Sequence, residues 1–202
     1  MRKYLVEFIG TLFLVMGAAL AGGVGAALSL MIMVYAGGHI SGGHYNPAVT
    51  LAVLVRNRIK FAEAMGYWIC QVAGAFAAAA VVMYIFKTEG AGACGIPEDG
   101  IMQGFAAEFL GTFALAFVVL NVATSKATAG NSYYGLAIGG TVLTMATVLG
   151  KFSGGAYNPA VAIGLCFQKS LCWSQLYIYL ISILAGGAVA GIVFNICNPD
   201  DK

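Results

Sequence analysis

The chain repeats part of its own sequence, and this repeat limits the possible folds more than any other feature. Residues Glu7–Thr11 (EFIGT) return as Glu108–Thr112 (EFLGT), and residues Ser41–Val49 (SGGHYNPAV) return as Ser153–Val161 (SGGAYNPAV). Nine residues that match with one difference, at equivalent places in two halves, do not arise by chance. We therefore expect two structurally equivalent halves.

Six apolar segments, three in each half, are long enough to cross a membrane. They cover approximately residues 4–22, 24–38, 61–86, 101–123, 133–150 and 171–197. A spanning helix needs about 20 apolar residues, and the first segment is interpreted as a retained span rather than a signal peptide. Three crossings per half is an odd number, so the second half (about 101–197) must lie upside down relative to the first (about 1–90). Residues 1–202 are predicted to form a single membrane domain.

The composition supports a membrane protein, because 60% of the residues are hydrophobic and only 9% are charged. Soluble domains carry about 25% charged residues. So few charges cannot cover a surface that faces water, which excludes a soluble enzyme and a disordered regulator. The net charge of +2 also excludes nucleic-acid binding, which needs a basic face. The predicted fold class is therefore an all-α membrane protein, with an inverted repeat, surrounded by lipid.

The basic residues between the spans predict the orientation in the membrane. With the N-terminus inside, the cytoplasmic basic residues are Arg2, Lys3, Arg56, Arg58, Lys60, Lys126 and Lys202. The outer ones are Lys87, Lys151 and Lys169. Because Lys and Arg concentrate on the cytoplasmic side of membrane proteins, we expect both termini in the cytoplasm of a multi-pass protein of the plasma membrane.

Two further apolar segments, Pro47–Val55 and Pro159–Phe167, are too short to cross. Nine residues of helix measure about 13 Å, so each can enter the membrane but not span it. Each follows an asparagine, which is a preferred N-cap, and starts with proline, which fits the first helical position. Asn46-Pro47-Ala48 and Asn158-Pro159-Ala160 therefore predict the starts of two re-entrant half-helices.

Because the repeat is inverted, the two half-helices enter from opposite sides, and their N-termini should meet near the midplane. The cap uses the side-chain oxygen of Asn46 and Asn158, and leaves both amide NH2 groups free to donate. The carbonyls expected to line a pore are those of Gly42, Gly43, His44, Gly154, Gly155 and Ala156. Two positive helix ends make the midpoint unfavourable for cations and protons. This pattern favours a narrow channel for water or small alcohols.

With these motifs the chain resembles the aquaporin or major intrinsic protein family. The resemblance rests on both Asn-Pro-Ala motifs, on the lead-in GHISGGH at residues 38–44, on the repeated EF(I/L)GT segments, and on Tyr67, Trp68 and Gln71 in the third span. It covers nearly the whole chain. It implies an aquaporin-like fold of six transmembrane helices and two re-entrant half-helices. It further implies a homotetramer with a passive pore in each protomer for water and small uncharged solutes, without a cofactor.

The resemblance also implies a narrow filter near the outer mouth, and here the chain departs from the family. The family usually has an arginine three residues after the second asparagine, where this chain has Val161. Ungapped counting places the other filter positions at Ala26, Ala146 and Gly155. Three small residues and a valine predict a wider and less polar filter without a fixed cation. We therefore expect passage of water and larger neutral solutes. The alternative is a glycerol, urea or ammonia facilitator with little preference for water.

Glu7 and Glu108 lie inside predicted spans, where a carboxylate is costly and is usually paired or functional. They allow two interpretations. They can accept hydrogen bonds from the irregular lead-in segments and hold them in place, which the family resemblance favours. Alternatively, they can carry a coupling ion or proton, which predicts a secondary transporter of a different class.

The sequence shows no sign of catalysis or of metal binding. Its five cysteines and two histidines form no CxxC pair and no Cys/His cluster. We find no nucleophile–base pair either. We therefore expect a protein that is not an enzyme, with no catalytic residue, no metal site and no cofactor. The cysteine spacing indicates no particular disulfide.

Overall fold

The computed structural model describes residues 1–92 and 94–201. Lys202, which the charge count placed in the cytoplasm, lies outside these residues. Over the described residues the regular structure is helical. The helices are α1 (Arg2–Ser41), α2 (Pro47–Val55), α3 (Phe61–Ile85), α4 (Ile101–Val119), α5 (Tyr134–Ser153), α6 (Pro159–Phe167) and α7 (Leu176–Cys197). Short 3-10 turns cover Glu98–Gly100, Lys126–Thr128 and Trp173–Gln175, and a π-helical turn, Leu120–Thr124, continues α4.

Helix α1 contains the first two predicted spans. Its 40 residues are about twice the length that one crossing needs. The backbone leaves the helical conformation at Ala21 and at Gly22, where φ is 57°. The chain reverses direction there, and the two ends of α1 lie side by side. A Cβ atom added at Gly37, near one end, would lie only 2.5 Å from Val6 Cγ1, near the other. With α1 counted as two spans, the predicted six crossings are confirmed.

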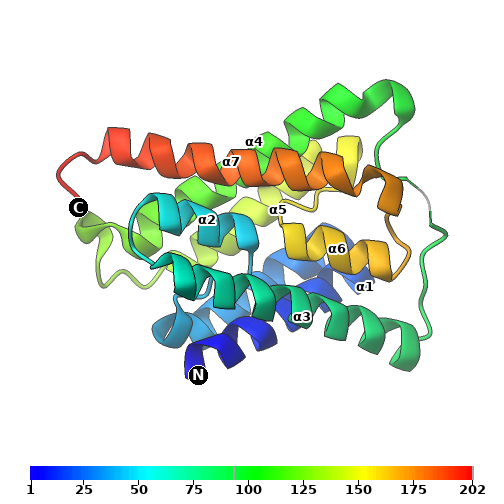
Figure 1. Ribbon diagram of the computed structural model, residues 1–202, viewed down its shortest axis with the longest axis horizontal. Helices are drawn as coiled ribbons and strands as arrows, with labels where there is room; N and C mark the ends of the chain where they lie inside the picture. The colour runs from blue at the N-terminus through cyan, green and yellow to red at the C-terminus, as the bar shows by residue number, and fades with distance from the viewer. Residues whose placement is uncertain (93, 202) are drawn as a thin grey trace.

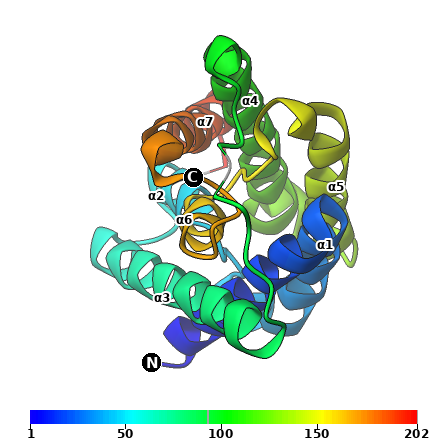
Figure 2. The ribbon, with the colours of Figure 1, turned by 90° about the vertical axis from the view of Figure 1, so that its right-hand side faces the viewer.

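The long helices surround the two short ones. In Figure 1 the long helices run mostly along the longest axis of the molecule, with α2 and α6 between them. Figure 2, which looks along the bundle, shows α6 near the centre with α1, α3, α4, α5 and α7 around it. The half-helices are therefore enclosed by protein, as irregular backbone at membrane depth requires.

Two glycines at equivalent positions show that the halves pack in the same way. A Cβ atom at Gly74 of α3 would lie 2.5 Å from the carbonyl oxygen of Phe8. A Cβ atom at Gly186 of α7 would lie 2.5 Å from the carbonyl oxygen of Phe109. Such close backbone approach drives helix association in lipid, where van der Waals packing replaces the hydrophobic effect. The α1–α3 contact of the first half thus returns as the α4–α7 contact of the second.

Candidate transmembrane pore

Both half-helices begin where the sequence predicts. Asn46 and Asn158 have extended backbones, and their side-chain oxygens accept hydrogen bonds from Ala48 N at 2.8 Å and from Ala160 N at 2.9 Å. Each proline occupies the start of its helix. The local cap signals therefore account for the boundaries of α2 and α6.

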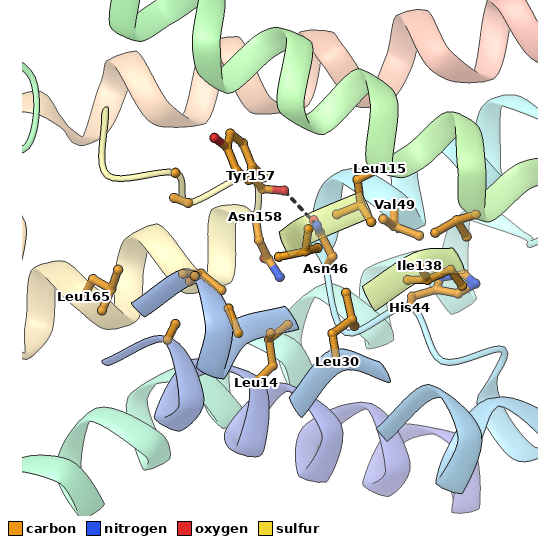
Figure 3. A pocket seen from close by; sticks show the side chains of 18 of the residues that line it. Leu14, Leu30, His44, Asn46, Val49, Leu115, Ile138, Tyr157, Asn158 and Leu165 are labelled. Carbon is orange, nitrogen blue, oxygen red and sulfur yellow. Dashed lines mark hydrogen bonds between the residues drawn. The ribbon is translucent and has the colours of Figure 1, made fainter. Parts of the chain in front are cut away.

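The same two asparagines join the halves of the molecule. Asn46 Nδ2 donates to the carbonyl oxygen of Tyr157, and Asn158 Nδ2 donates to that of Tyr45, both at 2.9 Å. Figure 3 shows the first of these bonds, with Leu14 and Leu30 on the opposite wall of the cavity. The expectation that both amide groups are entirely free needs correction, because each NH2 group commits one of its two hydrogens to the other half. One hydrogen per asparagine is left for a solute.

Tyr45 and Tyr157 hold these carbonyls in place. Both have φ of 49°, in the left-handed region that costs a non-glycine residue about 1–3 kcal/mol. Their hydroxyls donate to Met33 O at 2.9 Å and to Met145 O at 3.0 Å. Their rings lie where a side chain at Gly10 or Gly111 would collide with them. Sequence reasoning missed these tyrosines, although both lie inside the repeated nine-residue motif.

Glu7 lies in the wall of the bundle and binds the first lead-in segment. Its carboxylate accepts hydrogen bonds from Ser41 Oγ at 2.7 Å, His44 N at 3.0 Å, Tyr45 N at 2.6 Å and Gln71 Nε2 at 2.8 Å. The side chain is completely buried, and the residue is not among those that line the central cavity. This geometry corresponds to the predicted loop support.

Glu108 repeats the arrangement in the second half. It accepts hydrogen bonds from Ser153 Oγ at 2.6 Å, Ala156 N at 2.9 Å and Tyr157 N at 2.7 Å. It too is completely buried and away from the cavity lining. Two carboxylates that bind backbone amides on each side of the midplane explain why both lead-in segments keep the same irregular shape.

The halves differ around His44, whose counterpart is Ala156. Thr50 Oγ1 donates to Asn46 O at 3.1 Å and accepts from Gln71 Nε2 at 3.0 Å. The same hydroxyl shares a hydrogen bond of 3.0 Å with His44 Nδ1. The first half of the molecule therefore has a polar network around its lead-in segment, whereas the second half has Ala156 in place of His44.

A narrow cavity runs past both asparagines and has a volume of about 50 Å³ for water-sized contents. Its walls are mainly apolar and come from both halves. Among the aliphatic residues that line it are Leu14, Leu30, Val49, Leu115, Val119, Ile138, Val142 and Leu165. Of the predicted carbonyl residues, Gly43, His44, Gly154, Gly155 and Ala156 line it, whereas Gly42 lines a separate pocket.

Three of the four predicted filter residues, Ala26, Gly155 and Val161, line this cavity. Ala146 does not. It borders a neighbouring pocket of about 270 Å³, which shares Gly23 and Gly154 with the cavity. A Cβ atom at Gly23 would lie 2.5 Å from Ala146 Cβ. The α5 residue next to this position that lines the cavity is instead Val142, about one turn earlier in the helix. Counting along the sequence cannot show this, because it does not give the rotation of α5.

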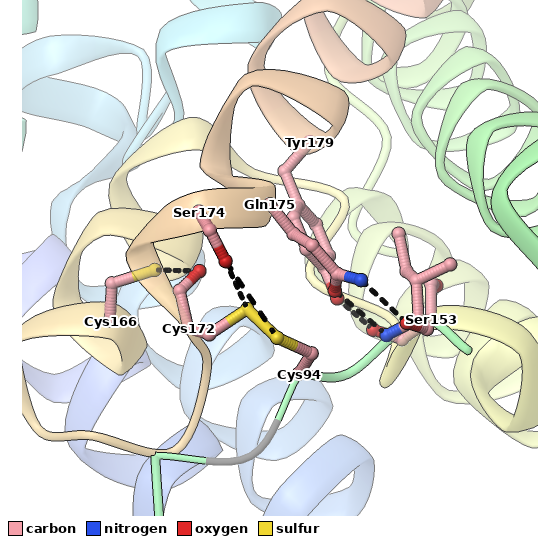
Figure 4. Close-up of a disulfide and its surroundings, with 8 residues drawn as sticks. Cys94, Ser153, Cys166, Cys172, Ser174, Gln175 and Tyr179 are labelled. Atoms are coloured by element: carbon pink, nitrogen blue, oxygen red, sulfur yellow. Dashed lines mark hydrogen bonds between the residues drawn. A yellow bond between two sulfur atoms is a disulfide. The ribbon is translucent and has the colours of Figure 1, made fainter. Parts of the chain in front are cut away.

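On the side where α6 ends, a disulfide ties two loops together. It joins Cys94, between α3 and α4, to Cys172, between α6 and α7 (Figure 4). Nearby, Ile96 N donates to Gln175 Oε1 at 3.1 Å, and Gln175 Nε2 donates to Ile96 O at 2.6 Å. The cysteine spacing did not indicate this pair, because its members are 78 residues apart and meet only in the folded chain. No group of three metal-binding side chains occurs among the residues described.

The chain is similar to known proteins both in sequence and in fold. The family model described as "Major intrinsic protein" matches residues 1–194. A curated relative, "Glycerol uptake facilitator protein-like 6" of Lactiplantibacillus plantarum, is 36% identical, and the match covers all of both chains. "Aquaporin NIP1-2" of Arabidopsis thaliana is 32% identical over all of this chain and 76% of its own. The aquaglyceroporin structure from Plasmodium falciparum has a similar fold, with a TM-score of 0.79, 18% identity and coverage of 98% and 97% of the two chains.

Proposed function

Because the chain belongs to the major intrinsic protein family, and is a passive channel for water and small neutral solutes rather than an enzyme, we propose that it passes glycerol- and urea-sized molecules as well as water. Nothing in the relatives or in the contacts of Glu7 and Glu108 supports the alternative of an ion-coupled transporter.

The observation that carries the proposal is the chemistry of the filter. Val161 occupies the place where the family usually has arginine, and Ala26 and Gly155 beside it are small. An arginine would present five N–H donors and a fixed positive charge. Without it, the N–H donors of the asparagines at the midplane remain to bind a solute, and the walls between are apolar. Such a pathway accepts molecules that carry CH groups as well as hydrogen-bonding groups.

The proposal is tested by stopped-flow light scattering on proteoliposomes, with empty liposomes as the baseline. We expect water, glycerol and urea each to cross faster than through the empty bilayer. The fluxes should rise linearly with concentration and should not depend on a proton or sodium gradient. A vesicle that gains permeability to water alone would contradict the wide filter, and saturable, gradient-dependent flux would contradict a channel.

A second candidate is a glycerol, urea or ammonia facilitator with little preference for water. It is favoured by the apolar walls, which bind water weakly, and by the printed name of the relative from Lactiplantibacillus plantarum. The two candidates differ in the ratio of water to glycerol permeability. In the same proteoliposomes, a high glycerol permeability with water flux near that of the empty bilayer favours the facilitator.

We also propose that both termini lie in the cytoplasm and that the protein resides in the plasma membrane. The disulfide between Cys94 and Cys172 supports this orientation, because disulfides persist on the oxidising face of a membrane. The free and exposed Cys197 at the end of α7 lies at the opposite end of the bundle.

These cysteines also provide the test of orientation. In intact cells, a membrane-impermeant reductant followed by an impermeant maleimide should label Cys94 and Cys172. Cys197 should react only after the cells are permeabilised. Labelling of Cys197 in intact cells would reverse the proposed orientation.

We further propose a homotetramer in which each protomer keeps its own pore. Support comes from the family resemblance and from the large apolar residues exposed on the outer helices, such as Leu28 and Ile32 of α1 and Leu136 of α5. These faces contact either lipid or neighbouring copies.

A further inference from the structure

At the end of the bundle that carries both termini, a buried arginine connects three segments. Arg56 follows α2, and its side chain is only 1% exposed. Its Nε donates to Thr124 Oγ1 at 2.6 Å, and its Nη2 donates to Thr124 O at 2.8 Å, in the π-helical turn after α4. Its guanidinium also lies 4.2 Å from the ring centre of Phe194 in α7. These contacts hold the guanidinium in a fixed position.

A single carboxylate, that of Asp201, collects the donors around this arginine. It forms an ion pair with Arg56 Nη2 at 3.1 Å, and it accepts hydrogen bonds from Arg58 Nη2 at 3.2 Å and from the backbone N of Lys126 at 3.0 Å. The backbone oxygen of Asp201 accepts a further hydrogen bond from Arg56 Nη1 at 2.8 Å. A hydrogen bond from Ser125, together with Arg56 and the Lys126 amide, lowers the pKa of Asp201 to about 2. The carboxylate is therefore charged at physiological pH, and these contacts do not form a pH switch there.

Apart from Arg58, the donors are held in place by contacts that do not involve the Asp201 carboxylate. Arg56 is positioned by Thr124 and Phe194, and Ser125 and Lys126 by the turn that they begin. An open pocket of about 480 Å³ lies beside the carboxylate, and Arg56, Arg58 and Asp201 all line it. A ligand from the aqueous side can therefore reach the donors without passing through the protein.

We propose that Arg56, Arg58, Ser125 and the backbone amide of Lys126 form an oxyanion-binding site, which Asp201 occupies in this conformation and which a phosphate group can occupy in its place. Arginine presents its N–H groups in a planar fork that fits carboxylate and phosphate oxygens alike. Phosphate offers more acceptor oxygens than a carboxylate to the same donors. Arg58, Ser125 and Lys126 also line the pocket of about 520 Å³ that Gly42 of the first lead-in segment lines.

The site is tested by replacing its occupant in the purified full chain. In neutral detergent at pH 7, Asp201→Ala should lower the melting temperature, because it leaves a buried guanidinium without its counter-charge. Inorganic phosphate should raise that melting temperature toward the wild-type value by several degrees, more than sodium chloride at equal ionic strength. Asp200→Ala, at the exposed neighbouring acid, is the matched control and should show neither effect. Asp201→Asn serves the same purpose if the alanine variant does not fold.

A second substitution and two lipids complete the experiment. Adding Arg58→Ala to the Asp201 variant should weaken the phosphate effect. In phosphate-free buffer, vesicles containing phosphatidic acid should stabilise the variant more than vesicles of phosphatidylcholine if a lipid headgroup is the ligand. Stabilisation by inorganic phosphate alone identifies a soluble ligand. If neither source stabilises the Asp201 variants beyond the chloride control, the proposed site is wrong.

Discussion

Replacing Glu108 with alanine is expected to prevent formation of the half of the pore that the second lead-in segment lines. The change leaves Ser153 Oγ and the backbone N–H groups of Ala156 and Tyr157 without their acceptor. Each buried donor that loses its partner costs about 1–3 kcal/mol. Since folded proteins are stable by only about 5–15 kcal/mol, three such losses remove much of the stability. We expect a large drop in the yield of monodisperse protein and in water permeability per molecule.

The control for this prediction is Glu98→Ala, which removes an exposed carboxylate from the turn before α4. It should leave yield and permeability unchanged. Glu108→Gln keeps one acceptor oxygen and should give an intermediate result. A Glu108→Ala protein that purifies and conducts like the wild type would show that the carboxylate does not hold the lead-in segment.

Changing Val161 to arginine is expected to narrow selectivity rather than to abolish flux. Val161 lies in the first turn of α6 and lines the cavity together with Ala26 and Gly155. A guanidinium there occupies space, and it adds a fixed charge next to the positive end of the helix. An extra barrier of about 1.4 kcal/mol for a solute lowers its permeability about tenfold. We expect at least this loss for glycerol and urea, and a smaller loss for water.

The measurement is the ratio of glycerol to water permeability in matched proteoliposomes. Val161→Leu is the control, because it adds bulk without charge or donors. If leucine changes the ratio as much as arginine does, size alone sets the selectivity. An unchanged ratio in the arginine variant would show that residue 161 does not control which solutes pass.

The elements with local signals were predicted to the residue. Asn46-Pro47 and Asn158-Pro159 define a cap and a first helical position, and both half-helices begin and end where the sequence indicates. The last span was predicted less well. Apolar residues continue from 171, but α7 begins at Leu176, because Cys172 and the turn Trp173–Gln175 connect it to the loops.

Features that depend on how helices face each other could not be read from the sequence. The rotation of α5 places Val142 rather than Ala146 in the wall of the cavity. The crossed bonds from Asn46 to Tyr157 and from Asn158 to Tyr45 join residues more than a hundred positions apart. The repeat predicted that the two motifs would meet, but not that each asparagine would bind the other half.

Those crossed bonds have a consequence for how solute moves. A carrier built from inverted repeats works by alternating access, in which one repeat rocks against the other. Here such rocking would pull each asparagine amide away from the carbonyl it binds, at the place where the two repeats meet. The midplane is therefore a fixed joint rather than a hinge. Solute can therefore move in either direction through one conformation, without the conformational cycle by which a carrier transports its substrate.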